Sequence, residues 1–418
     1  MIFVCIYMFF LWGIIFFNYK KYSSIITYIT FGVYFSLFLY LLYWSNLADK
    51  TKSFLFNYIF IITAVLCTVY AIISCKNNNI SPVTGNVYVT KFGKQIFWSL
   101  NLVFLLLYFF ENYLGSHSFF PGLVGIDIHT YSAPIISYFT NAQYLLLVFN
   151  YYYFKATKKK ISILFIFIDT IVPVITRLAR MSIVIALFQF GSLVIFLFMS
   201  QRKNNITLKE KKSLNRKKKN IIRFGIFGFI VLSVFTQYRM NLHNADFSYS
   251  DGIGFIGPKW LNWLSAFYGY FPMSFNNLKI NILYRTVKHN YVGLYSFFSL
   301  YFGIFQIDNI FGINTTGQLV GRLITNGLAT VPTAFWDFYY DFGLLFFIPI
   351  IVGMIITYYF EKKASKERLY LTYRTLYFWY APYWFFISFQ NTLFLAPAII
   401  NAFLIYFIIK YSFRIKAN

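Results

Sequence analysis

Long apolar stretches recur along the chain and constrain its fold more than any other feature. A helix of about twenty apolar residues spans the roughly 30 Å hydrocarbon core of a membrane. Eleven stretches approach this length, and they cover residues 1–17, 25–45, 54–74, 96–114, 135–154, 161–177, 181–200, 221–237, 342–360, 375–390 and 393–410. The sequence therefore predicts an all-α, polytopic integral membrane protein with about eleven transmembrane helices.

The composition favours lipid as the main solvent of the chain. Hydrophobic residues make up 59% of the sequence and charged residues only 12%, so a water-soluble fold would have too little polar surface. The net charge of +25 would suit a nucleic-acid partner, but the basic residues form short blocks between the apolar stretches. This arrangement indicates membrane orientation and no nucleic-acid binding.

The distribution of Lys and Arg predicts the orientation of the chain. If the N-terminus is outside, 27 of the 37 basic residues fall in cytoplasmic loops and ten in outer loops. Because cytoplasmic loops carry an excess of positive charge, we expect the N-terminus out and the C-terminus in. The first stretch, Met1 to Phe17, has neither a basic leader nor a small-residue cleavage site, so it is expected to be a retained span.

A large external loop is predicted at residues 238–341, between spans eight and nine. Within it, Trp260, Trp263 and Phe267 have helical spacing, which is typical of an interfacial helix or of a surface that stacks on sugars. The apolar stretch 292–307 is short for a crossing and is expected to be re-entrant or interfacial. With no internal repeat visible, residues 1–418 are expected to form a single integral membrane domain with interfacial or re-entrant helices in this loop.

Most groups capable of proton transfer fall in the predicted outer loops. All four histidines and most carboxylates lie there, so proton-transfer chemistry is expected outside. The cytoplasmic loops hold no paired-acid DxD motif and no glycine-rich phosphate loop, which disfavours a cytosolic nucleotide site. The three cysteines have no CxxC spacing, and no cluster predicts a metal. No cofactor is expected.

The segment TRLARMS, between spans six and seven, predicts an anion site at the outer face. Arg177 and Arg180 lie there against the positive-inside bias, and the planar fork of arginine binds phosphate in a bidentate manner. The alternative is that both side chains reach lipid headgroups or pair with Asp169, which lies inside the sixth span.

Further candidates lie in and after the large loop. Arg285 and His289 are four residues apart in YRTVKHN, and on a helix they would place a phosphate binder and a base on one face. Arg322 is another outer cation, and Asp337 and Asp341 are carboxylates just before the ninth span.

Two stretches resemble a known family, as does the architecture: the bacterial O-antigen and capsule oligosaccharide repeat-unit polymerases of the Wzy type. TRLARMSIVIALFQFGSLVIF is similar to the family's short Arg-containing turn that opens a helix. Residues 326–360, NGLATVPTAFWDFYYDFGLLFFIPIIVGMIITYYF, are similar to its aromatic-rich approach, Asp-Phe-Gly step and span with a central glycine. Here the step is Asp341, Phe342 and Gly343, and the later glycine is Gly353.

The chain departs from the family pattern at one position. It lacks a basic residue between Thr333 and Tyr340, where Trp336 and Asp337 stand. Arg322 or Arg285 would then have to complete the phosphate site.

The resemblance implies a function in the bacterial cytoplasmic (inner) membrane. The chain would be a metal-independent glycosyltransferase that polymerises undecaprenyl-diphosphate-linked oligosaccharide repeat units into O-antigen lipopolysaccharide or capsule on the external face. The resemblance also implies as partners the lipid-linked glycan, membrane lipid, a flippase and a chain-length regulator. The diphosphate would be held by Arg177, Arg180, Arg285 and Arg322, and the base would be His289, Asp337 or Asp341.

Two other functions remain open at this level. A lipid-linked oligosaccharide flippase is equally apolar and basic, but it would have short loops on both faces and charged residues along a central cavity. The external segment of about a hundred residues favours an enzyme. An O-antigen ligase shares the lipid donor, and the sequence barely separates it from a polymerase.

Overall fold

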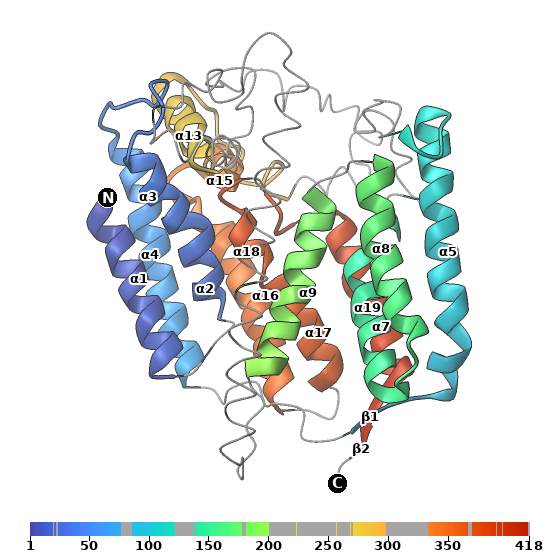
Figure 1. The fold of residues 1–418 in the computed structure, drawn as a ribbon. Coiled ribbons are helices and arrows are strands. Elements are labelled where there is room, and N and C mark those ends of the chain that lie inside the picture. The colour runs from blue at the N-terminus through green and yellow to red at the C-terminus, as the bar shows by residue number, and fades with distance from the viewer. Residues whose placement is uncertain are drawn as a thin grey trace. The chain divides into compact units, whose positions relative to one another are not determined.

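The computed structural model describes most of the predicted apolar stretches. It covers residues 1–19, 21, 24–76, 86–121, 136, 139–177, 181–199, 223, 256, 268, 271–297, 333–366, 370–389, 391–394 and 396–416. Most of these residues lie in helices (Figure 1), in agreement with the predicted all-α class.

Helices of the structure overlap ten of the eleven predicted apolar stretches, all but the eighth. Residues 221–237 lie outside the described residues except for Arg223. The helices are α1 (Ile2–Phe17), α2 (Ile25–Ile29), the π-helical turn η1 (Thr30–Tyr34), α3 (Phe35–Leu41), α4 (Phe54–Cys75), α5 (Lys91–Ser116), α7 (Gln143–Thr157), α8 (Ile161–Arg177), α9 (Met181–Met199), α16 (Phe347–Lys366), α17 (Tyr370–Tyr380), α18 (Tyr383–Phe386) and α19 (Ala396–Ser412). The tenth stretch, 375–390, is divided between the end of α17 and the short helix α18, and part of the fifth, 135–154, lies outside the described residues.

Two of these helices are long and apolar enough to cross a membrane. These are α4 and α5. The helical segments Ala334–Leu345 and Phe347–Ser365, which meet at a bend, make a third if the two together count as one span. Further apolar helices among the described residues are shorter. Length and composition therefore support membrane-crossing helices, and the total of eleven stays a prediction.

The chain divides into two compact units, each assembled from segments far apart in sequence. The first unit combines Met1–Lys76, Gln201–Met354 and Trp384–Leu393. The second combines Asn77–Ser200, Ile355–Tyr383 and Phe394–Asn418.

In the first unit, α1 and α4 pack beside the helix formed in succession by α2, η1 and α3 (Figure 1). Gly32, in the π-helical turn, lies very close to a neighbouring segment, since a Cβ on it would clash with the main chain of Phe385. Only glycine fits such a contact. At one end of this unit, Lys21 donates to the carbonyl of Ser74, so the ends of α1 and α4 with predicted cytoplasmic charges lie together.

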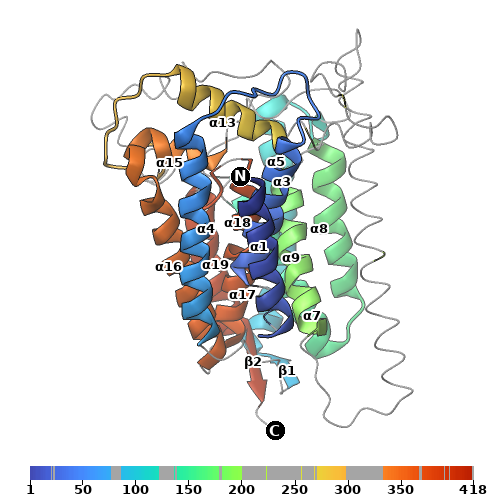
Figure 2. The same ribbon diagram turned by 90° about the vertical axis from the view of Figure 1, so that its left-hand side faces the viewer.

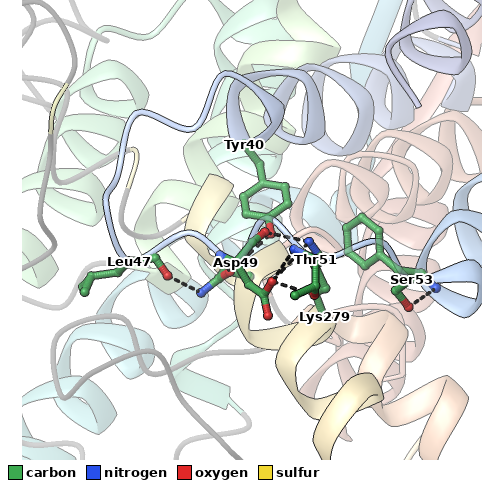
Figure 3. A network of polar contacts seen from close by, with 8 residues as sticks. Tyr40, Leu47, Asp49, Thr51, Ser53 and Lys279 are labelled. Carbon is green, nitrogen blue, oxygen red and sulfur yellow. Dashed lines mark hydrogen bonds and ion pairs between the residues drawn. The ribbon is translucent and has the colours of Figure 1, made fainter.

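At the other end of the first unit, helix α13 (Pro272–Tyr284) packs against α3 and α4 (Figure 2). The loop after α3 binds it through polar contacts, shown in Figure 3, that we name the α13 clamp. Lys279 forms an ion pair with the carboxylate of Asp49 at 3.6 Å and donates to its main-chain oxygen at 2.6 Å. Asn276 accepts from the Asp49 amide at 2.7 Å and from the Tyr40 hydroxyl at 3.2 Å. The clamp therefore joins a short loop to the predicted large external loop.

The second unit is a helical bundle with a short β-ribbon at one end (Figure 1). Strands β1 (Asn86–Val89) and β2 (Phe413–Lys416) pair antiparallel, with Val89 opposite Phe413. The sequence did not predict this ribbon. The ring of Phe413 packs on Phe149 and Tyr152 of α7. The start of α5, the last turns of α7 and the end of α19 therefore meet here, and all three were predicted to be cytoplasmic.

One residue counted as a loop cation lies inside the second unit. Arg374 is in the second turn of α17, is fully buried, and precedes Thr375, whose carbonyl accepts from the hydroxyl of Tyr144 at 2.9 Å. Arg374, counted among the 27 cytoplasmic residues, therefore lies in a helix and not in a loop, and the side of the membrane on which it lies stays a prediction. The positive-inside bias keeps its sign without this residue.

Candidate functional site

The Asp-Phe-Gly step forms a sharp break at the end of a helix of the first unit. Helix α15 (Ala334–Phe342) and the 3₁₀ turn η7 (Gly343–Leu345) meet α16 at an angle of 111°. Gly343 has φ +54° and ψ −123°, a conformation essentially reserved for glycine, so α15 cannot continue through it. The predicted ninth span, 342–360, accordingly begins at Phe347 and follows a separate helix.

The chain after α13 leads to this break as an irregular segment. Helix α13 ends at Tyr284, and Arg285 has an extended backbone with φ −118° and ψ 130°. The helical arrangement considered for Arg285 and His289 therefore does not occur. In a non-helical segment, residues four apart can be separated by up to about 13 Å.

Asp341 anchors the segment that follows His289. Its side chain is fully buried, and its carboxylate accepts from Asn290 Nδ2 at 2.6 Å, from the amide of Tyr295 at 3.0 Å and from the amide of Ser296. A carboxylate has about four acceptor positions, and both oxygens are used here. The geometry thus gives Asp341 a role in holding the loop against α15.

His289 lies directly over the glycine of the break. Its Nδ1 is 3.1 Å from the carbonyl oxygen of Tyr340. A carbonyl oxygen can only accept, so Nδ1 carries a proton, and in the neutral tautomer that this contact selects the lone pair is on Nε2. A Cβ on Gly343 would lie 2.9 Å from Nε2, which shows how closely the ring covers this glycine. Among the described residues, Nε2 has no hydrogen-bond partner.

Aromatic rings surround this histidine. The ring centroid of Tyr291 is 5.8 Å from that of His289, and the centroid of Tyr339 is 5.5 Å from it. Partial burial raises the pKa of the Tyr339 phenol, so its hydroxyl stays protonated. The ring of Tyr340 meets Tyr295 edge-on at 4.6 Å. The site therefore presents an imidazole among phenol rings.

Two further predicted site residues lie on the elements that form this region. Asp337 is in the first turn of α15, partly buried, and its main-chain oxygen accepts from the Ser296 hydroxyl at 3.3 Å. Arg285 is partly buried and forms no ion pair within the described part of the chain. Both stay candidates for the roles given to them from the sequence.

The other predicted site residues lie outside the described residues or have side chains that are not described. Arg177 ends α8, but its side chain is not described. The other such residues are Arg180, Arg322, Trp260, Trp263, Phe267 and 298–307. The described structure thus brings together His289 and Asp341 and leaves most of the predicted phosphate site untested.

Asp169, weighed above as a partner for arginine, belongs to a buried polar cluster of the second unit. Its Oδ2 accepts from Asn150 Nδ2 at 3.0 Å, and Asn150 exchanges hydrogen bonds with Asn101. All three side chains are buried. The sequence does carry a signal for this cluster, because Asn101 and Asn150 each lie within a predicted apolar stretch, 96–114 and 135–154.

Sequence reasoning missed three residues of the first-unit site. Asn290 holds the loop, Tyr291 lies beside the imidazole, and the Tyr340 carbonyl fixes the tautomer of His289. The sequence Asn290-Tyr291-Val292-Gly293 carries turn-forming residues and could have drawn attention. The carbonyl has no sequence signature.

Comparison with known proteins adds no assignment: no family model, no curated protein and no solved structure matches the chain.

Proposed function

We propose that this chain is a polysaccharide polymerase, a multispan glycosyltransferase of the bacterial cytoplasmic membrane. It joins undecaprenyl-diphosphate-linked oligosaccharide units on the external face into O-antigen or capsular polysaccharide. The observation that carries the proposal is the orientation of His289, whose Nδ1 faces the Tyr340 carbonyl and whose Nε2 is left to accept a proton. A neutral imidazole oriented in this way is a general base.

The proposed reaction needs one base and one site for a leaving anion. A hydroxyl of the acceptor glycan attacks the anomeric carbon of the donor while Nε2 of His289 takes the hydroxyl proton. The bond between the anomeric carbon and the phosphate oxygen breaks, and the undecaprenyl diphosphate leaves with the electron pair. Cations placed in advance near those oxygens stabilise the developing charge.

The geometry orders the candidates for the base. Asp341 already accepts from one side-chain amide and two main-chain amides, so taking a proton would compete with the contacts that hold the loop. His289 has a lone pair free of such contacts within the described residues. We therefore assign the base to His289 and an anchoring role to Asp341, with Asp337 as the alternative carboxylate.

The phosphate site is assigned from the sequence. Arg285 precedes His289 in the same irregular segment, and four residues of extended chain span at most about 13 Å, a length that accommodates a sugar ring between a diphosphate and the base. Arg177, Arg180 and Arg322 complete the proposed set.

The proposed topology has about eleven spans, with the N-terminus out and the C-terminus in. Within the first unit, the contact of Lys21 with Ser74 joins two predicted cytoplasmic ends, and the α13 clamp joins two predicted external loops. Within the second unit, the β-ribbon joins segments predicted to be cytoplasmic. These pairings support the assignment of sides.

The test is reconstitution of purified protein with undecaprenyl-diphosphate repeat units alone. We expect a ladder of longer lipid-linked glycans without nucleotide, ATP or added metal. His289→Gln should slow the transfer about 10²-fold or more without lowering the protein level, because it removes the base. Lys288→Ala, an exposed neighbour, is the matched control and should keep the rate.

Two outcomes would replace the proposal. Movement of the lipid-linked unit across vesicles without extension would make the chain a flippase. Transfer of glycan only to a lipopolysaccharide core, and never to another lipid-linked unit, would make it a ligase.

A further inference from the structure

Tyr291 is held in a backbone conformation that a residue with a side chain seldom adopts. Its φ is +55°, in the left-handed region. The neighbouring contacts impose this conformation: the Tyr291 amide donates to the main-chain oxygen of Asp341 at 3.0 Å, and Asn290 Oδ1 accepts from the amides of Val292 at 2.9 Å and Gly293 at 3.0 Å.

A helix end does not explain this conformation. The other non-glycine residues with positive φ in the described structure are Tyr43, His117 and Lys158. Each lies just after a helix, where a left-handed residue commonly lets the last turn close. Tyr291 lies seven residues after α13, so its unfavourable backbone needs another reason.

The side chain of Tyr291 makes few contacts that would offset this unfavourable backbone. It is 59% exposed, and its hydroxyl has no hydrogen-bond partner within the described residues. The ring lies beside the imidazole of His289 at an interplanar angle of 62°. Strained residues that the surroundings hold in place cluster at binding and catalytic sites.

The chemistry of this pair fits a sugar ring. One face of a pyranose is a set of C–H groups, which pack on an aromatic face, while its hydroxyls require acceptors at the edge. Tyr291 supplies the exposed aromatic face, and Nε2 of His289 supplies an acceptor next to it. A lipid tail would have no use for the acceptor, and a phosphate would require a cation.

We propose that Tyr291 is the stacking platform for the acceptor sugar and presents the attacking hydroxyl to His289. This inference rests on the proposed function, because the acceptor is defined by that reaction. It adds a sugar subsite to the site described above. It also explains the strained backbone of Tyr291, which holds the ring exposed beside His289.

The backbone strain allows a discriminating test, because replacing Tyr291 with glycine should make the protein more stable and its binding of the acceptor weaker. Tyr291→Gly removes the backbone strain and should raise the unfolding temperature, while the KM for the acceptor rises about tenfold. Tyr291→Phe keeps the ring and should stay close to wild type in both measurements. Tyr284→Ala removes another exposed tyrosine, 64% accessible at the end of α13, and should leave the KM unchanged.

A binding measurement separates this inference from the proposed function. The probe is the lipid-free oligosaccharide released by mild acid from the host's own polyprenyl diphosphate, observed by saturation-transfer NMR with the full-length protein. We expect transfer to the sugar with wild type, Tyr291→Phe and Tyr284→Ala, and its loss with Tyr291→Gly.

Each remaining outcome has a defined meaning. Loss of binding in Tyr291→Gly without any polymerisation by wild type would support the subsite and remove the polymerase. Polymerisation by Tyr291→Gly with an unchanged KM would keep the polymerase and overturn the subsite. A lower unfolding temperature in Tyr291→Gly would overturn the argument from strain.

Discussion

At the scale of single residues, the structure distinguishes side chains that the sequence offers equally for one role. His289, Asp337 and Asp341 were equal candidates for the base, and the donors around Asp341 separate it from His289. These donors include main-chain amides, and the partner of His289 is a main-chain carbonyl. The sequence carries no information about such partners, so it could name the candidates but not rank them.

Gly343→Ala tests the link between the helix break and the imidazole. The new Cβ would lie 2.9 Å from the His289 ring, and φ +54° with ψ −123° is strained for alanine. We expect a loss of about 1–3 kcal/mol in the free energy of unfolding and a lower polymerisation rate. Thermal unfolding and the ladder assay measure the two effects.

The matched control for this change is Gly191→Ala. A Cβ at Gly191, in α9, meets nothing within 4 Å, and alanine favours a helix. Its stability and rate should stay unchanged or rise slightly. Equal losses in the two variants would show that Gly343 has no special contact with His289.

At the scale of elements, the apolar stretches predicted most helices because an apolar run as long as a bilayer crossing is visible in the sequence itself. The break at Gly343 was not predicted, since 342–360 looks like one continuous stretch. The β-ribbon was missed for a related reason: Asn86–Val89 and Phe413–Lys416 are each four residues long and gain their pairing only from each other. Tertiary pairing of short strands leaves little local pattern.

The α13 clamp predicts a pH-dependent contribution to stability. Burial raises the pKa of Asp49, but hydrogen bonds from Thr51 and the ammonium of Lys279 outweigh it, so the net pKa is below the ordinary value. A lowered pKa means that the folded state favours the carboxylate. The stabilisation is complete above the unfolded value of about 3.9 and is lost as the pH falls through the folded value.

Asp49→Ala should therefore lower the unfolding temperature at neutral pH, with a loss of about 1–3 kcal/mol, and the difference from wild type should shrink in acid. Burial lowers the pKa of Lys279 by more than Asp49 raises it, so Asp49→Ala leaves a buried cation without its carboxylate partner.

Adding Lys279→Met to Asp49→Ala should recover part of the lost stability. Lys52→Ala, an exposed neighbour, should change nothing. A difference that persists unchanged in acid would contradict the ionic account.

At the scale of the whole molecule, the order of basic residues predicts the side of each loop. Reporters fused after Lys160 and Lys366 should read cytoplasmic, and reporters after Gly122 and Phe255 external. Phosphatase and fluorescence fusions measure the two sides. An external reading after Lys160 would reverse the second unit's assignment, including the side of the β-ribbon.

The β-ribbon also sets an order of events during synthesis. Val89 leaves the ribosome long before its partner Phe413, which lies 324 positions later in the chain. At roughly 5–20 residues per second, the first strand waits on the order of tens of seconds for the second. Through that interval its main-chain groups have no sheet partner, and the nascent second unit stays open at this end until translation delivers β2. A pause in translation shortly before Phe413 would therefore prolong the exposure of an unpaired strand edge.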